Sequence, residues 1–341
     1  MSVHQIKEAF TQLGHYLLSD DEELVSLVNA SHHYNAWFTA DQVRNAVRSL
    51  GTMLNEQDIE QWIDSAYAGK MNGGKSKVVG LVLAGNIPLV GFHDILTVLA
   101  SGHIASVKLS SQDKHLTPHI LKRLTEFYPA LADRVLYVDR LKDFDAVIAT
   151  GSNNTSRYFE YYFQSVPHII RRNRNSIAVL DGTETTEDFV ALGYDIFNYF
   201  GLGCRNVSKL LVPEGYNFVP FFEAIEEPFH GMINHHKYAN NYDYNKSIYL
   251  VNGAKHLDNG FLLLKRDEGI ASPLAVLFFD EYKNQKDAEV KLRAVSEQIQ
   301  CVVTKGKLSI NSQVVGLGCS QSPRLWDYAD GIDTFAFLLS I

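Results

Sequence analysis

The feature that most constrains the fold of this chain is an alternation of apolar runs and helical patterns that begins at residue 78. Residues 78–83 form a nearly continuous apolar run, which is typical of a strand buried on both faces of a sheet. A helical pattern follows over residues 89–101, and further strands are expected at residues 104–109 and 146–149. Strands that alternate with helices are joined by crossover connections, so this stretch predicts an α/β fold with a parallel sheet.

The segments on either side of this alternation carry weaker signals. Apolar residues at helical spacing, among them Ile6 and Phe10, predict that residues 1–68 are helical. Asn55 is expected to cap one of these helices. After residue 176 the sequence predicts helices at 186–200 and 287–298, and strands at 177–180, 207–212, 247–251, 261–264, 274–279 and 300–304.

Charge and cysteine content exclude several classes of protein. The net charge of -8 argues against a surface that binds nucleic acid. Three cysteines are an odd number and do not form the pattern of a disulfide-rich secreted protein. The first residues lack the basic start and apolar core of a signal peptide, and the longest apolar stretch is shorter than the ~18 residues of a membrane span. We therefore expect a cytoplasmic protein without a membrane span.

Two stretches of the sequence suggest known binding sites, but neither has the sequence context that such a site requires. Residues 69–76, GKMNGGKS, fit the phosphate-loop pattern, but a helical pattern precedes them and a strand-like run follows. That order is the reverse of the one that cradles a phosphate, so a linker is expected. His230, His235 and His236 lack the spacing of a zinc site and a cysteine partner, so no metal site is expected.

Small polar residues follow three of the expected parallel strands, at residues 84–88, 108–111 and 150–154. Ligands of a parallel sheet bind beyond the carboxyl ends of its strands, so these segments favour a nucleotide with phosphate groups. However, no G-x-G-x-x-G sequence follows the first strand. GLGCRN at residues 201–206 lacks the final glycine, and an ordinary Rossmann dehydrogenase is therefore disfavoured.

Cys204 stands where a helical pattern stops and an apolar run begins, and it is either a reactive thiol or a small buried residue. Cys301 lies inside an apolar run and is expected in the core. Cys319 shares the GLGC context but lacks the preceding helix and the following strand. A thiol just past a helix C-terminus meets the negative end of the helix dipole, which raises its pKa. Arg205, Lys209 or a bound cofactor would have to offset that effect.

Three motifs stand in order across residues 77–212. They are AGNIPLVGF and VKLSS after two successive strands, then Thr150-Gly151-Ser152, then a helix, a glycine-rich turn with Cys204 and a strand. In this order they resemble the aldehyde dehydrogenase superfamily, and within it the acyl-CoA reductases of the LuxC type. QSPRLWDYADGIDT near the end of the chain is similar to the LuxC-type subgroup.

The resemblance implies an aldehyde dehydrogenase-like α/β fold in three parts. They are an N-terminal helical segment (1–76), a parallel-sheet domain that binds a nicotinamide cofactor (77–176) and an α/β catalytic cysteine domain (177–341). It also implies reduction of an acyl-CoA, such as a fatty acyl-CoA, or of another acyl thioester to the aldehyde through a Cys204 thioester. Negative charge on the substrate's carbonyl oxygen would be bound by the Asn86 amide and the backbone N–H of Cys204.

The same resemblance identifies the cofactor-binding residues as Lys108, Ser110, Ser111, Gly151, Ser152 and Glu268. Family members that prefer NAD often carry a glutamate where this chain has Ser111, so NADPH is the expected cofactor and NAD the alternative. Glu268 stands one residue out of register with the glutamate that binds the ribose in the superfamily.

Ile170 occupies about the position of the glutamate that activates water in hydrolytic aldehyde dehydrogenases. His168 close by is either a substitute base or a structural histidine. Without a base, transfer to a thiol and hydride transfer are favoured over hydrolysis. The resemblance further implies a homo-oligomer and allows a partner protein that delivers the acyl group. The alternatives are an aldehyde or semialdehyde dehydrogenase of the same superfamily and, in another class, a non-catalytic nucleotide-binding or partner-scaffolding module.

Overall fold

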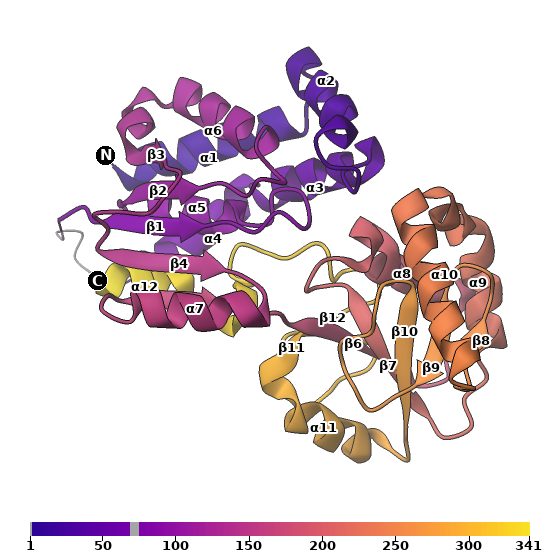
Figure 1. The fold of residues 1–341 in the computed structure, drawn as a ribbon. Coiled ribbons are helices and arrows are strands. Elements are labelled where there is room, and N and C mark those ends of the chain that lie inside the picture. The colour runs from indigo at the N-terminus through magenta and orange to yellow at the C-terminus, as the bar shows by residue number, and fades with distance from the viewer. Residues whose placement is uncertain (1, 69–74) are drawn as a thin grey trace. The chain divides into compact units, whose positions relative to one another are not determined.

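The computed structural model describes residues 2–68 and 75–341. The chain divides into two units, Met1–Asn173 with Pro323–Ile341 and Arg174–Ser322, and each contains one sheet (Figure 1). The expected three-part division at residues 76 and 176 stays a prediction. The linker expected at residues 69–76 falls mostly outside the described residues.

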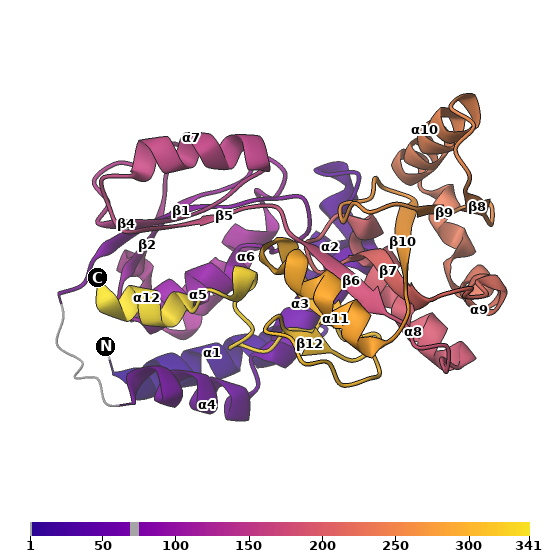
Figure 2. The ribbon, with the colours of Figure 1, turned by 90° about the horizontal axis from the view of Figure 1, so that it is seen from below.

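The first unit is built on a five-stranded parallel sheet in the order β3-β2-β1-β4-β5. Its strands are β1 (Val78–Val82), β2 (Ile104–Lys108), β3 (Val135–Tyr137), β4 (Ala146–Thr150) and β5 (His168–Arg171). Helix α7 (Asn153–Phe163) covers one face, and the other is covered by α5 (Phe92–Ala100), α6 (Leu116–Phe127) and α12 (Thr334–Ser340) (Figure 2). Because helices cover both faces, the central strands are mostly apolar, and the expected parallel sheet is confirmed.

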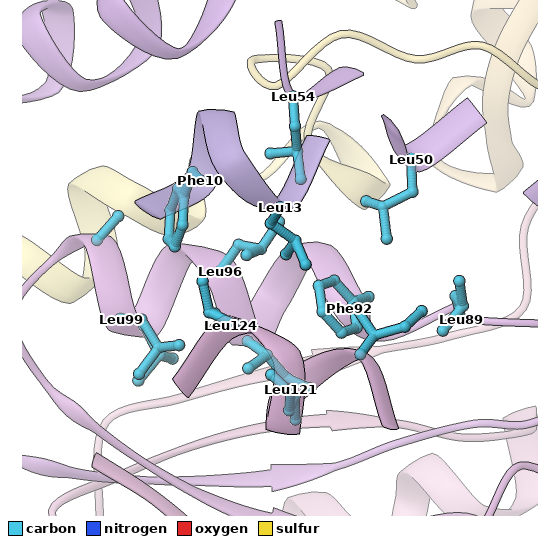
Figure 3. Packing of buried hydrophobic residues seen from close by; sticks show 14 of the residues in the cluster. Phe10, Leu13, Leu50, Leu54, Leu89, Phe92, Leu96, Leu99, Leu121 and Leu124 are labelled. Carbon is cyan, nitrogen blue, oxygen red and sulfur yellow. The ribbon is translucent and has the colours of Figure 1, made fainter. Parts of the chain in front are cut away.

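The N-terminal segment packs on the helical layer of the first unit. It contains α1 (Val3–Leu17), α2 (Glu22–Ala30), α3 (Ala40–Met53) and α4 (Glu56–Tyr67). Figure 3 shows side chains of α1, α5 and α6 in the shared core, including Phe10, Leu13, Phe92, Leu96 and Leu124. The Asn55 side chain accepts a hydrogen bond from the Asp58 N–H and caps α4, as predicted. These helices therefore belong to the core that supports the sheet.

The C-terminal segment of the first unit is held by an arginine that also forms a buried ion pair. Arg171 at the end of β5 binds Asp94 of α5 through two contacts, with Nη2 2.6 Å from Oδ1 and Nε 3.2 Å from Oδ2. The same guanidinium donates to the Ala329 carbonyl at 2.7 Å and to the Thr334 hydroxyl at 2.9 Å. One arginine thus holds the edge strand, a sheet-covering helix and the returning chain together.

The second unit contains a seven-stranded sheet in the order β12-β11-β6-β7-β10-β9-β8. All neighbours are parallel except β8 and β9. The strands are β6 (Asn175–Val179), β7 (Val207–Pro213), β8 (Leu257–Asp258), β9 (Leu263–Arg266), β10 (Val276–Tyr282), β11 (Ile299–Val303) and β12 (Val314–Val315). The strands expected between residues 177 and 304 are confirmed, except the one at 247–251.

Residues 247–251 are the last turn of a helix, so the strand predicted there is wrong. The helices of this unit are α8 (Thr186–Phe197), α9 (Val219–Phe229), α10 (His236–Val251) and α11 (Gln285–Ala294). Tyr238, Tyr242 and Tyr249 recur at helical spacing and bury one face of α10. This tertiary packing outweighs the strand preference of the final Ile-Tyr-Leu-Val run. Among the described residues, no helix is long and apolar enough to cross a membrane.

Candidate active site

The carboxyl ends of β1, β2 and β4 meet at one edge of the sheet in the first unit. The chain runs outward from β1 to β2 and β3, then returns to the other side of β1 for β4 and β5. The strand order therefore reverses between β1 and β4, which is where open parallel sheets bind ligands. Asn86 and all the predicted cofactor residues except Glu268 lie at the ends of these three strands.

The turn after β1 carries Asn86 and is fixed on both sides. A Cβ on Gly85 would lie 2.7 Å from the Cβ of Ser110, so only glycine allows this turn to approach the segment after β2. On the other side Leu89 has a φ of 59° and donates its N–H to the Asp113 carboxylate at 3.1 Å. Burial raises the pKa of Asp113. Asn86 between these two anchors is exposed.

The segment after β2 holds three of the predicted cofactor residues. Lys108 is the last residue of the strand and is half-buried, as is Ser110. The Ser110 hydroxyl accepts the Gln112 N–H at 3.2 Å, and Ser111 is exposed. These positions leave a hydroxyl and an ammonium at the edge where a nucleotide is expected.

Gly151 and Ser152 lie at the start of α7, directly after β4. The Gly151 N–H donates to the Arg171 carbonyl at 3.3 Å, and the Ser152 hydroxyl caps the helix by accepting the Thr155 N–H at 3.3 Å. The N-terminus of α7 therefore points its positive dipole end toward the edge of the sheet where β1 and β4 end.

Cys204 lies in a tight turn between α8 and β7 of the second unit. Tyr199, Phe200 and Gly201 reach this turn in the left-handed conformation, with φ of 52°, 57° and 79°. The turn is closed by the Asn206 N–H, which donates to the Gly203 carbonyl at 3.1 Å. Cys204 is half-buried at the second position of the turn. Asn86 and Cys204 belong to different units, and each is positioned by its own unit.

Two neighbours of Cys204 were not recognised in the sequence. The Ser176 hydroxyl donates to the Cys204 carbonyl at 3.1 Å. The buried side chain of Asn206 contacts the end of α8 and the N–H of Gly203. An asparagine two residues after the cysteine was visible in the sequence, but only the folded turn shows which backbone groups its amide meets.

The other two cysteines have different surroundings. Cys301 is fully buried in β11, where burial raises the pKa of its thiol, and its expected place in the core is confirmed. Cys319 is exposed in a loop held by the Asp195 carboxylate, which accepts the N–H groups of Gly318 at 2.6 Å and Ser320 at 2.9 Å. No disulfide joins any of the three cysteines. Among them, only Cys204 is half-buried in a turn between a helix and a buried strand.

Glu268 is exposed on the loop after β9, and Lys209 of β7 holds that loop. The Lys209 ammonium donates to the carbonyl oxygens of Asp267 at 3.0 Å and Glu268 at 2.8 Å, and burial lowers the pKa of Lys209. Arg205 donates to the Gln313 side chain at 3.1 Å. Both cations that could offset the helix dipole at Cys204 therefore have partners of their own.

The histidines singled out in the sequence have local partners. His230 contacts Glu226 at 3.0 Å, and His235 accepts the Tyr238 N–H and so caps α10. Within the described residues, no three His, Cys, Asp or Glu side chains are grouped to hold a metal ion. His168 contacts the Val166 carbonyl at 2.8 Å at the start of β5, and Ile170 is half-buried further along that strand.

Comparisons with known proteins identify the family. A comparison with curated protein sequences gives no match. A benzaldehyde dehydrogenase from Corynebacterium glutamicum, described as NAD-dependent, has 14% identity and a TM-score of 0.69, and the match covers 93% of this chain and 82% of that one. An oxidoreductase from Marinobacter aquaeolei has 13% identity and a TM-score of 0.68, with coverage of 95% and 79%. At such identities the likeness shows the fold alone, which is the expected aldehyde dehydrogenase-like fold.

An aldehyde dehydrogenase from Mycobacterium tuberculosis, solved with NAD+, shares that fold at 12% identity and a TM-score of 0.65, with coverage of 93% and 78%. The family model for acyl-CoA reductase (LuxC) matches residues 12–220, which is more than half of the chain and includes both Asn86 and Cys204. The chain belongs to the acyl-CoA reductase (LuxC) family.

Proposed function

We propose that this protein reduces an acyl-CoA, in particular a fatty acyl-CoA, to the aldehyde through a thioester on Cys204, with NADPH as the reductant. Membership of the LuxC family supports an oxidoreductase that acts on acyl and aldehyde groups. The observation that carries the mechanism is the half-buried Cys204 in the turn between α8 and β7. The acyl group arrives on CoA or on an acyl-carrying protein.

In the proposed first step the Cys204 thiolate attacks the thioester carbonyl carbon. Negative charge then develops on the carbonyl oxygen and is stabilised by the Asn86 amide and the Cys204 N–H. Collapse of this tetrahedral intermediate breaks the bond to the CoA sulfur, and CoA leaves as a thiolate. Because Ile170 stands where a water-activating carboxylate is expected, hydrolysis of the enzyme thioester is disfavoured.

The donor groups of the first unit fit a nicotinamide cofactor. Ser110, Ser111 and Lys108 supply hydroxyls and a positive charge after β2, and Gly151 and Ser152 lie at the N-terminus of α7. Phosphates bind readily at such a helix N-terminus. Glu268 is the candidate for a ribose hydroxyl. When bound, the cofactor supplies the hydride that reduces the acyl group to the aldehyde.

Product analysis tests the reaction. Incubation with acyl-CoA and NADPH is expected to yield aldehyde and free CoA in equal amounts. Oxidation of aldehyde to free acid with NAD would instead indicate an aldehyde or semialdehyde dehydrogenase. Absence of both reactions, with no acyl-enzyme detected by mass spectrometry, would indicate a non-catalytic module.

The Asn86→Ala variant is expected to lower kcat about 100- to 1000-fold, because one donor to the developing oxyanion is lost. The KM for acyl-CoA should change little, since the charge develops only in the transition state. Asn29→Ala, at an exposed position of the same unit, is the control and should keep wild-type activity. An unchanged kcat in folded Asn86→Ala would remove Asn86 from the mechanism.

The Ser111→Glu variant is expected to lower the preference for NADPH over NADH about tenfold. A carboxylate at this exposed position repels the 2′-phosphate, and two unit charges 4 Å apart interact by about 1 kcal/mol even in bulk water. The ratio of kcat/KM for the two cofactors measures the effect. Ser111→Gln adds similar bulk without charge and should leave the ratio nearly unchanged, whereas equal effects of both variants would argue for a steric cause.

A further inference from the structure

The side chain of Asn206 joins the end of α8 to the turn that carries Cys204. Asn206 is only 1% exposed. Its amide nitrogen lies 3.1 Å from the Asp195 carbonyl oxygen, 3.3 Å from that of Ile196 and 2.8 Å from that of Asn198. Its amide oxygen accepts the Gly203 N–H at 2.8 Å. A single side chain therefore binds both the helix end and the turn.

Without a hydrogen-bond donor, these carbonyl groups would disfavour the thiolate form of Cys204. Asp195 and Ile196 are in the last turn of α8, whose final carbonyls have no partner within the helix. Together they carry the partial negative charge of the helix C-terminus, which disfavours a nearby thiolate. The cationic side chains of Arg205 and Lys209 have other partners. The Asn206 amide supplies N–H donors directly to the carbonyls.

The backbone between α8 and the Cys204 turn also has a conformation that must be stabilised by its surroundings. Tyr199 and Phe200 are held in the left-handed conformation, which is unfavourable for residues other than glycine. Such a conformation persists only where its surroundings determine it. The contacts of Asn206 with Asn198 before this strained pair and with Gly203 after it fix both ends of the segment.

We propose that Asn206 is a positioning residue, which holds the Cys204 turn and shields the thiol from the carbonyl groups at the end of α8. This inference rests on the proposed function of Cys204 as the nucleophile. Asparagine suits the role because its amide has both N–H donors and an acceptor oxygen. An aspartate of nearly the same shape has no N–H donors. When ionised it only accepts hydrogen bonds, and when protonated it offers a single O–H to the three carbonyl oxygens, so in either form the end of α8 loses donors.

The test is the pH dependence of Cys204 alkylation in the Asn206→Asp variant. Cys319→Ser is used as the background so that the exposed thiol of Cys319 is absent, and iodoacetamide labelling of the Cys204 peptide is followed by mass spectrometry. The midpoint of the titration is expected to rise by about one pH unit, which is about a tenfold slower reaction at neutral pH. The kcat with acyl-CoA should fall in parallel, and KM should change little.

Other charged and titratable groups lie near this turn, and the substitution removes none of them. They are Arg205 in the turn, Asp195 of α8, His235, which packs on Phe200, and the Cys301 thiol of β11. Asn252→Asp is the matched control, because it places a new carboxylate at the exposed C-cap of α10. It should leave the titration of Cys204 unchanged.

Asn206→Ser keeps one donor and one acceptor, and it replaces Asn206→Asp if that variant does not fold. An intermediate shift of the midpoint is expected. A midpoint equal to that of wild type in either folded variant would overturn the role of Asn206. Alkylation requires no acyl-CoA, so it separates this inference from the proposed reaction. If Cys204→Ala keeps its activity, the proposed function fails, whereas the effect of Asn206 on the thiol can still be measured.

Discussion

The Cys204→Ala variant is expected to lose formation of both aldehyde and free CoA, by roughly a thousandfold or more. The thiolate forms the only covalent bond between the protein and the acyl group in the proposed reaction, and alanine cannot form it. Aldehyde is measured by chromatography and CoA with a thiol reagent. Mass spectrometry of wild-type enzyme incubated with acyl-CoA alone should show an acyl adduct that the variant lacks.

Cys319→Ser is the matched control for this experiment. Cys319 is the other exposed or half-buried cysteine, and it occupies the second GLGC sequence. The control should keep its activity and its acyl adduct. Normal turnover by Cys204→Ala would contradict the assignment of Cys204. Loss of activity and of the acyl adduct in Cys319→Ser instead would contradict it as well.

The Arg171→Met variant is expected to lose about 3–5 kcal/mol of stability in the first unit. It removes one partner of a buried ion pair and leaves the Asp94 carboxylate, with a side chain only 10% exposed, without its cation. The contacts of Arg171 with Ala329 and Thr334 are lost as well. Urea unfolding followed by tryptophan fluorescence measures the effect, because all three tryptophans, Trp37, Trp62 and Trp326, lie in this unit.

The neighbouring residue provides a control with the same change of charge. Arg172 pairs with Glu160, and the two side chains are 60% and 42% exposed. Arg172→Met is expected to cost less than about 1 kcal/mol, since exposed ion pairs contribute little. Equal losses of stability in the two variants would show that the buried pair has no special role in holding the C-terminal segment.

The parallel sheet of the first unit could be predicted from the sequence because its signal is local. A strand buried on both faces must be apolar at every position, so residues 78–83 could be recognised without knowing their neighbours. The cap at Asn55 is local in the same way, because it joins residues only three apart. Cys204 could be placed in a turn between a helix and a strand for this reason as well.

Elements that depend on distant partners were not predictable. The sequence at the end of α10 resembles a strand, and it is helical in the structure because the tyrosines of α10 are buried on one face of the helix. The last residues of the chain pack within the first unit, where Arg171 donates to Ala329 and Thr334, which are more than 150 residues away in sequence. A contact between residues so far apart leaves no pattern in the local sequence from which it could be predicted.

The sequence by itself determined the class of fold, the family and the choice of Cys204 and Asn86 as candidates. Each of these depends on short motifs and on their order along the chain. Only the tertiary structure decided what surrounds the thiol. The end of α8 disfavours a thiolate at Cys204 when the sequence alone is considered. Folding brings the amide of Asn206 onto carbonyl groups at the end of that helix, and these hydrogen bonds across eight to eleven residues become possible only when the turn has closed.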